Sequence, residues 1–79
     1  MMNNQWNVLY ENHIMVHMDY QKQLKRIREE LLITQTELAE MLGVAFATIN
    51  RWERGHHEPS IRQKRKIRDF CRKHKISIE

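Results

Sequence analysis

The stretch from residue 34 to 55 constrains the fold more than any other part of the chain, because it carries start and stop signals for two short helices. Thr34 and Glu37 have the spacing of a capping box, in which each side chain accepts a hydrogen bond from the backbone N–H of the other. Gly43 follows, and glycine readily adopts the positive φ that ends a helix. These signals predict a helix of only two turns over residues 35–42.

A second helix is predicted over residues 46–54, beginning within three residues of Gly43 and stopped by Gly55. Two short helices joined by a three-residue turn that contains glycine form a helix-turn-helix unit. Ala39 falls where the two helices cross, and a larger side chain there would force them apart. The positions expected to point inward are apolar: Leu38, Leu42, Val44, Ile49 and Trp52.

Two more helices are expected on either side of this unit. Asp19 is placed to cap a helix over residues 20–31. Its apolar residues recur at helical spacing as Tyr20, Leu24, Ile27 and Leu31. Ser60 and Gln63 form a second capping box, opening a helix that extends to about His74. The expected fold is an all-α bundle of about four helices.

Several short motifs within residues 24–60 have the spacing of a known family. They are Thr34-Gln35, Glu37-Leu38-Ala39, Leu42-Gly43-Val44, Thr48-Ile49, Arg51-Trp52-Glu53, Gly55 and Pro59-Ser60. On these motifs, which extend over about half of the chain, it resembles the Xre/Cro/phage-repressor (Cro/C1-type) helix-turn-helix family. The resemblance implies a small lambda-repressor-like bundle that binds double-stranded DNA and places its second helix in the major groove.

The same resemblance implies which residues touch DNA bases. On a helical wheel Ala45, Ile49, Trp52 and Glu53 share the inward side, whereas the implied base contacts lie outward or lateral: Phe46, Ala47, Asn50 and Arg51. Arginine can bind guanine and asparagine can bind adenine through two hydrogen bonds, whereas Phe46 and Ala47 can only touch thymine methyl groups. Packing of Phe46 against Met41 is an equal alternative.

Phosphate contacts are expected around this reading helix. Gln35 stands at the start of the helix over 35–42, where unpaired N–H groups and the helix dipole favour an anion. The full expected set is Thr34, Gln35, Arg54, His56, His57 and Arg62. The resemblance also implies a partly buried ion pair between Arg28 and Glu53, which would orient the helices.

Two residues depart from the family pattern. Ala45 stands where the family usually has a capping Ser or Thr, so the reading helix is expected to lack a side-chain cap, at a cost of about 0.5–2 kcal/mol. Leu32 stands where many members have glycine, which puts a positive-φ turn there in doubt. With few hydrogen-bonding groups at Ala45–Ala47, modest specificity is expected, or specificity that rests on Asn50, Arg51 and DNA shape.

The net charge of +4 is unevenly distributed. Up to Ser60 there are six Lys and Arg against eight Asp and Glu, whereas residues 61–79 have eight against two. A basic block of this kind indicates a polyanion partner or a solvated helix face. We expect its charges to surround the helix, with solvation favoured for Arg72, Lys73 and Lys75.

The functional prediction is a sequence-specific transcriptional regulator that acts as a homodimer. Two alternatives remain open: a DNA-docking accessory module, such as an antitoxin, a restriction-modification component or part of a larger DNA-processing protein, and a protein-interaction module. A toxin or another protein partner is compatible with either. No nucleophile–base pair or carboxylate dyad points to an enzyme, and no cofactor is expected. Adjacent His56 and His57 do not form a metal site.

The chain is expected in the cytoplasm, associated with the nucleoid through DNA. Cys71 is the single cysteine and is expected to be buried, and no secretory signal or membrane-length apolar run is seen. Residues 1–18 are read as an arm, a short hairpin or an extra segment, and residues 19–79 as the DNA-binding domain.

Overall fold

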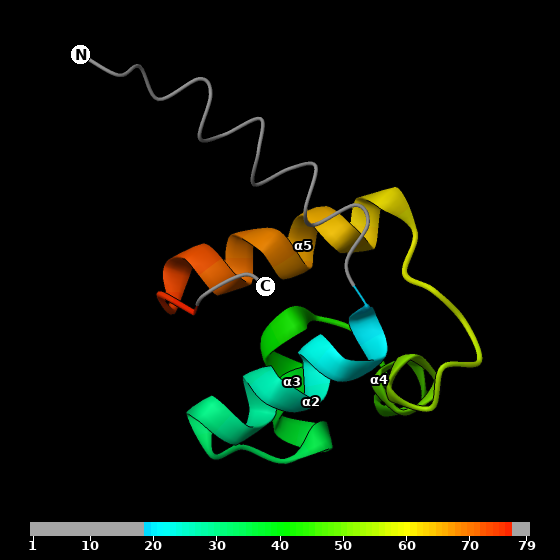
Figure 1. The fold of residues 1–79 in the computed structure, drawn as a ribbon, viewed down its shortest axis with the longest axis horizontal. Helices are drawn as coiled ribbons and strands as arrows, with labels where there is room; N and C mark the ends of the chain where they lie inside the picture. The colour runs from blue at the N-terminus through cyan, green and yellow to red at the C-terminus, as the bar shows by residue number, and fades with distance from the viewer. Residues whose placement is uncertain (1–18, 77–79) are drawn as a thin grey trace.

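A computed structural model describes residues 19–76, and Figure 1 shows the arrangement of their helices. The helices are α2 (Tyr20–Leu31), α3 (Gln35–Leu42), α4 (Phe46–Glu53) and α5 (Ile61–Lys73), with no strand in this part of the chain. The predicted all-α bundle is therefore confirmed. α2 and α3 have the predicted bounds, and α4 ends one residue before the predicted 54. The interpretations of residues 1–18 lie outside the described residues.

Three of the helices begin with the caps that the sequence predicts. The Asp19 carboxylate accepts a hydrogen bond from the Lys22 N–H at 3.3 Å. The capping box of α3 is complete, since Thr34 N–H donates to Glu37 Oε1 at 2.8 Å and Glu37 N–H to Thr34 Oγ1 at 3.1 Å. The box of Ser60 at the start of α5 is complete in the same way. At α4, Ala45 makes no such bond, as expected.

All four described helices end through a residue with positive φ. Two of these residues are Gly43 and Gly55. The other two are Leu32, at φ 57°, and Lys75, at φ 56°. The positive-φ turn that the sequence put in doubt at Leu32 is present, and the Ile33 N–H donates to the Arg28 carbonyl at 3.0 Å. The turn therefore forms although a leucine adopts this backbone conformation only at a steric cost.

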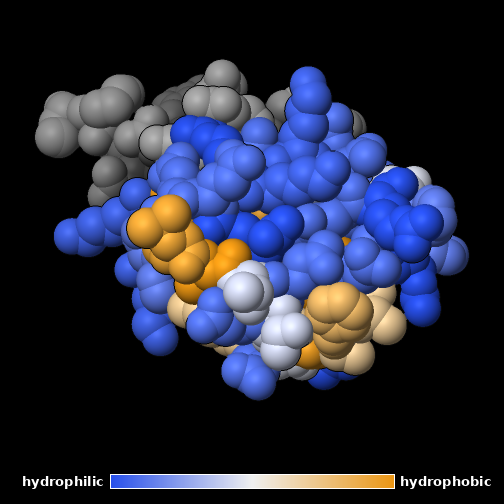
Figure 2. All heavy atoms as spheres, turned by 90° about the horizontal axis from the view of Figure 1, so that it is seen from below, coloured by the Kyte–Doolittle hydropathy of each residue, from blue (hydrophilic) through white to orange (hydrophobic). Residues whose placement is uncertain are grey.

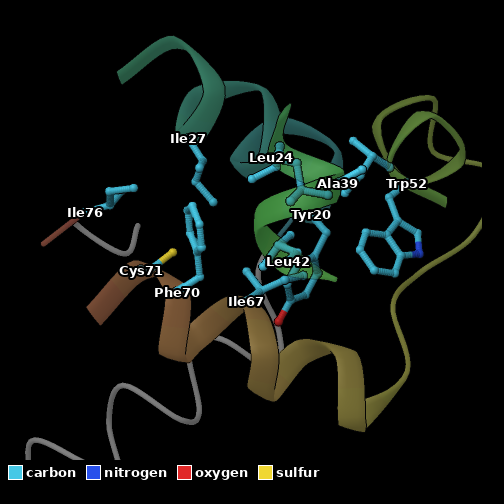
Figure 3. Close-up of a cluster of buried hydrophobic side chains, with 12 residues drawn as sticks. Tyr20, Leu24, Ile27, Ala39, Leu42, Trp52, Ile67, Phe70, Cys71 and Ile76 are labelled. Carbon is cyan, nitrogen blue, oxygen red and sulfur yellow. The ribbon is translucent and has the colours of Figure 1, made fainter. Parts of the chain in front are cut away.

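The hydrophobic core lies where the four helices meet, as Figure 3 shows. α4 packs against α2 and α3, and α5 packs against α3. The buried apolar residues are Tyr20, Leu24, Ile27, Leu38, Ala39, Leu42, Ile49, Trp52, Ile67, Phe70, Cys71 and Ile76. Trp52 is therefore a core residue, and α4 is held with one side facing the bundle.

Candidate nucleic-acid interface

One side of α4 is buried and the other faces solvent. Ile49, Trp52 and Glu53 are buried. Ala47, Arg51 and Arg54 are exposed, Asn50 is half-buried, and half of the Phe46 surface is exposed. The wheel is wrong for Ala45, which is exposed because it precedes the first helical turn. The structure thus brings Ala47 and Arg51 to the open side of the helix.

A bidentate ion pair fixes α4 to α2. Arg28 Nε donates to Glu53 Oε2 at 2.7 Å, and Nη2 donates to Oε1 at 2.9 Å. The Glu53 side chain is 2% exposed, whereas that of Arg28 is 25% exposed. The hydrogen bond to Glu53 raises the pKa of Arg28 despite opposing desolvation, so this cation stays charged. Two parallel hydrogen bonds between planar groups fix the orientation of the two side chains as well as pairing their charges.

Gln35 extends this network from α3. Its side-chain Nε2 donates to Glu53 Oε1 at 3.2 Å and lies 3.5 Å from Asn50 Oδ1. The amide expected to meet phosphate therefore lies against α4, and it also orients Asn50, an expected base contact. Sequence reasoning missed this contact because Gln35 and Asn50 are fifteen residues apart in the chain. The backbone N–H groups of the first turn of α3 still mark a helix start that favours anions.

The segment between α4 and α5 carries three of the expected phosphate contacts. Arg54, His56 and His57 are all exposed. Farther along, Glu58 forms an ion pair with Lys64 of α5, and the Lys64 Nζ lies 5.4 Å from the centre of the Tyr20 ring. These contacts fasten the segment to the bundle close to the exposed histidines.

Lys64 is the main residue that sequence reasoning misplaced. It is 8% exposed, although it belongs to the basic block interpreted as a polyanion-binding surface or a solvated helix face. A signal was present, because Lys64 lies three residues before Ile67 and seven before Cys71, the spacing of one helix face. Burial, with the charge of Glu58 nearby, raises the pKa of Tyr20 to about 12.

The remaining surface carries scattered apolar side chains. The large exposed ones are Leu32, Met41, Phe46 and Ile61. Figure 2 shows a mostly hydrophilic face on which the hydrophobic atoms form separate spots. Phe46 and Met41 both retain about half of their exposure, at 49% and 47%. Dispersed apolar residues of this kind are normal for a protein surface.

The described residues show little that favours another kind of site. Within residues 19–76, no cluster of three or more His, Cys, Asp or Glu side chains has the geometry to hold a metal ion. Burial raises the pKa of the Cys71 thiol to about 11, which disfavours the nucleophilic thiolate. No helix in this part of the chain is long and apolar enough to cross a membrane.

Comparison with known proteins gives one match. A protein-family model described as helix-turn-helix matches residues 24–77. Neither the search of curated proteins nor the search of solved structures found a match. The matched residues contain α3, its Gly43 turn and α4, together with α5 and most of α2. The chain therefore belongs to the Cro/C1-type helix-turn-helix family of DNA-binding proteins.

Proposed function

We propose that this chain is a sequence-specific transcriptional regulator that reads the major groove of duplex DNA with α4. The observation that carries the proposal is the fixed presentation of this helix. Glu53 anchors α4 through Arg28 and Gln35, while Arg51 stands exposed on the other side. A recognition helix needs this combination, because a base contact is specific only when the backbone behind it is held in place.

The base contacts are assigned by the chemistry of each side chain. Arg51 is suited to bind O6 and N7 of guanine, and Asn50 to bind N6 and N7 of adenine. Gln35 Nε2 uses one lone pair of Asn50 Oδ1, so the second lone pair can accept from adenine N6 while Asn50 Nδ2 donates to N7. Phe46 and Ala47 contribute apolar contact with thymine methyl groups.

The phosphate contacts surround this helix on both sides. Thr34 and Gln35 supply the start of α3, where the N–H groups and the dipole favour an anion. The loop after α4 supplies Arg54, His56 and His57, and the first turn of α5 supplies Arg62, all of them exposed. These contacts set the position of the protein on DNA without reading sequence.

We propose that the regulator acts as a homodimer on a palindromic site. Two recognition helices spaced one helical turn apart, about 34–36 Å, would contact two half-sites in successive major grooves. A single α4 with two hydrogen-bonding base readers offers few contacts, and pairing two copies doubles the number of bases read.

Binding-site selection from a random duplex library tests the proposal, performed at about 50 and 200 mM salt because phosphate contacts depend on salt. Wild type should enrich a palindromic motif, and Arg51→Ala should lose or relax it at one position per half-site, as expected for a lost contact of about 1–3 kcal/mol. Lys25→Ala, which removes an exposed cation of α2, is the matched control and should keep the motif. An unselective wild type would contradict the proposal.

The exposed Phe46 favours one second candidate, a protein-interaction module that keeps the fold without reading DNA. In that case Arg51→Ala would bind duplex DNA as wild type does, and Phe46→Ala would abolish binding of a protein partner. Loss of the selected motif in Arg51→Ala would exclude it.

A further inference from the structure

The outward side of α5 is a continuous charged surface. α5 buries Lys64, Ile67, Phe70 and Cys71. The opposite side, at 100° per residue, consists of Arg62, Arg65, Lys66, Asp69, Arg72 and Lys73, all exposed. The sequence predicted that the charges would surround the helix. In the structure they do not. They gather on this one side, which we call the cationic face of α5, apart from the buried Lys64 and the half-buried Arg68.

The cationic face has five cations against one carboxylate. Its one carboxylate, Asp69, forms an ion pair with Arg68 at 3.2 Å. Glu58, the acidic residue closest before the helix, is paired with the buried Lys64 and not with the cationic face. Arg62, Lys66 and Lys73 fall within about 40° of one another around the helix axis, and Lys66 and Lys73 lie about 10 Å apart along it. The row thus extends over nearly the whole helix.

The reading unit itself is poor in positive charge. Between Thr34 and Glu53 the sequence has one cation, Arg51, against Glu37, Glu40 and Glu53. Binding of duplex DNA depends strongly on neutralising phosphates with Lys and Arg. Half of the exposed Lys and Arg side chains of the described residues lie instead on α5.

Beyond Arg62 in its first turn, the cationic face does not share a surface with the outward side of α4. Figure 1 shows α5 along one side of the α2–α3 pair, with α4 at another side of that pair. The apolar side of α5 packs toward α3, so its cationic face points away from the bundle. A straight duplex held against α4 therefore leaves the second half of α5, with Lys73, to other partners.

The composition of the cationic face selects the kind of partner. Protein interfaces have a core of aromatic and other apolar residues, depleted of charge. The cationic face has no apolar residue between Arg62 and Lys73 on its outward side. Phosphates of nucleic acid need only a row of cations and no apolar anchor. We propose that the cationic face of α5 binds the backbone of a second duplex DNA segment, so that one molecule holds two segments together.

A bridging assay tests this proposal. A duplex immobilised on beads is incubated with the full chain and a fluorescent duplex. The fluorescence captured on the beads is measured as a function of salt concentration. R65Q/K73Q removes two charges of the cationic face, and K22Q/K25Q removes two exposed lysines of α2 as the matched control. Since each phosphate contact contributes about 0.9 to the salt slope, R65Q/K73Q should weaken capture roughly 60-fold at 0.1 M salt. The control should bridge like wild type.

The inference relies on the proposed function only in that α4 holds the first DNA segment. The variant Arg51→Ala distinguishes a failure of the inference from a failure of the proposed function. If the proposed function fails and the inference holds, wild type shows no selected motif, yet R65Q/K73Q still lowers salt-dependent capture. A dimer that bridges through two copies of α4 would instead lose capture in Arg51→Ala and keep it in R65Q/K73Q, which overturns the inference. The inference would also be overturned if wild type captured no fluorescent duplex but sedimented with phosphatidylserine vesicles.

Discussion

Leu32 combines a strained backbone conformation with an exposed apolar side chain. It has a φ of 57°, a region that costs an L-residue roughly 1–2 kcal/mol. Its side chain is 89% exposed and so gains little from packing. The following residue explains why the turn persists: Ile33 packs against the core, and its N–H closes the end of α2. The packing of the partly buried Ile33 opposes the strain at Leu32.

Replacement of Leu32 by glycine should therefore stabilise the protein. We expect Leu32→Gly to raise the free energy of unfolding by about 1 kcal/mol, because glycine adopts this φ without a Cβ clash. Urea unfolding followed by circular dichroism at 222 nm measures the change. Leu32→Ala is the control, since it removes the exposed side chain but keeps the Cβ, and it should gain little. Equal gains in both variants would show that the exposed leucine, not the backbone, is responsible.

At the scale of helices, the Arg28–Glu53 pair joins α2 to α4 with unequal burial on its two sides. Glu53 is 2% exposed and Arg28 is 25% exposed. Removal of Arg28 leaves a buried carboxylate uncompensated, so we expect Arg28→Met to cost about 3–5 kcal/mol in the free energy of unfolding. Glu53→Leu leaves a cation that water can reach, so its cost should be smaller. R28M/E53L should cost less than Arg28→Met alone.

The surface ion pair of α2 provides the comparison for this double-mutant cycle. Arg26 and Glu30 lie 3.1 Å apart, and their side chains are 28% and 42% exposed. Glu30→Gln should cost at most about 0.5 kcal/mol, as is typical of exposed i,i+4 pairs. The cycle is measured by urea unfolding of all variants. Equal costs for Arg28→Met and Glu53→Leu would contradict the role given to burial.

The start of α4 is a second element-scale weakness. Ala45 occupies the N-cap with extended backbone, φ −74° and ψ 152°, and makes no side-chain hydrogen bond. Ala45→Ser should stabilise the protein by about 1 kcal/mol, because the serine hydroxyl accepts a hydrogen bond from an N–H of the first turn. The reverse change at α3, Thr34→Ala, should destabilise by a similar amount. Thermal unfolding of both variants checks the pair, and a destabilised Ala45→Ser would show that this helix start has no room for a cap.

These elements also show what the sequence could predict. The caps at Asp19, Thr34 and Ser60 are local in sequence, so helix starts were predictable. The turns at Leu32 and Lys75 were less so, because the isoleucine after each one packs against the core, and such a tertiary contact has no local sequence signal. The outward side of α4 followed from helical spacing, whereas the Gln35 amide contact joins two helices and has no sequence pattern. Charge composition likewise did not separate buried Lys64 from its exposed neighbours.

The whole molecule should lose stability in alkali, because two buried groups resist ionisation. Burial raises the pKa of Cys71 from 9.0 to about 11, and that of Tyr20, with the nearby charge of Glu58, from 10.0 to about 12. In both cases the folded state holds its proton at a pH where the unfolded chain has lost it. The free energy of unfolding should therefore be unaffected by these groups below pH 9 and should fall as the pH rises toward 11 and 12.

Two variants assign this loss to its groups. Cys71→Ala removes the first titration, so its free energy of unfolding should fall less than that of wild type between about pH 9 and 10, before Tyr20 contributes. Tyr20→Phe should retain that early fall and lose the later one. Urea unfolding at fixed ionic strength, followed by circular dichroism because tyrosine ionisation disturbs fluorescence, measures both. If Cys71→Ala fell as steeply as wild type from pH 9, the thiol would be reaching solvent in the folded protein, and the packing of α5 against the bundle would be looser than the closed core implies.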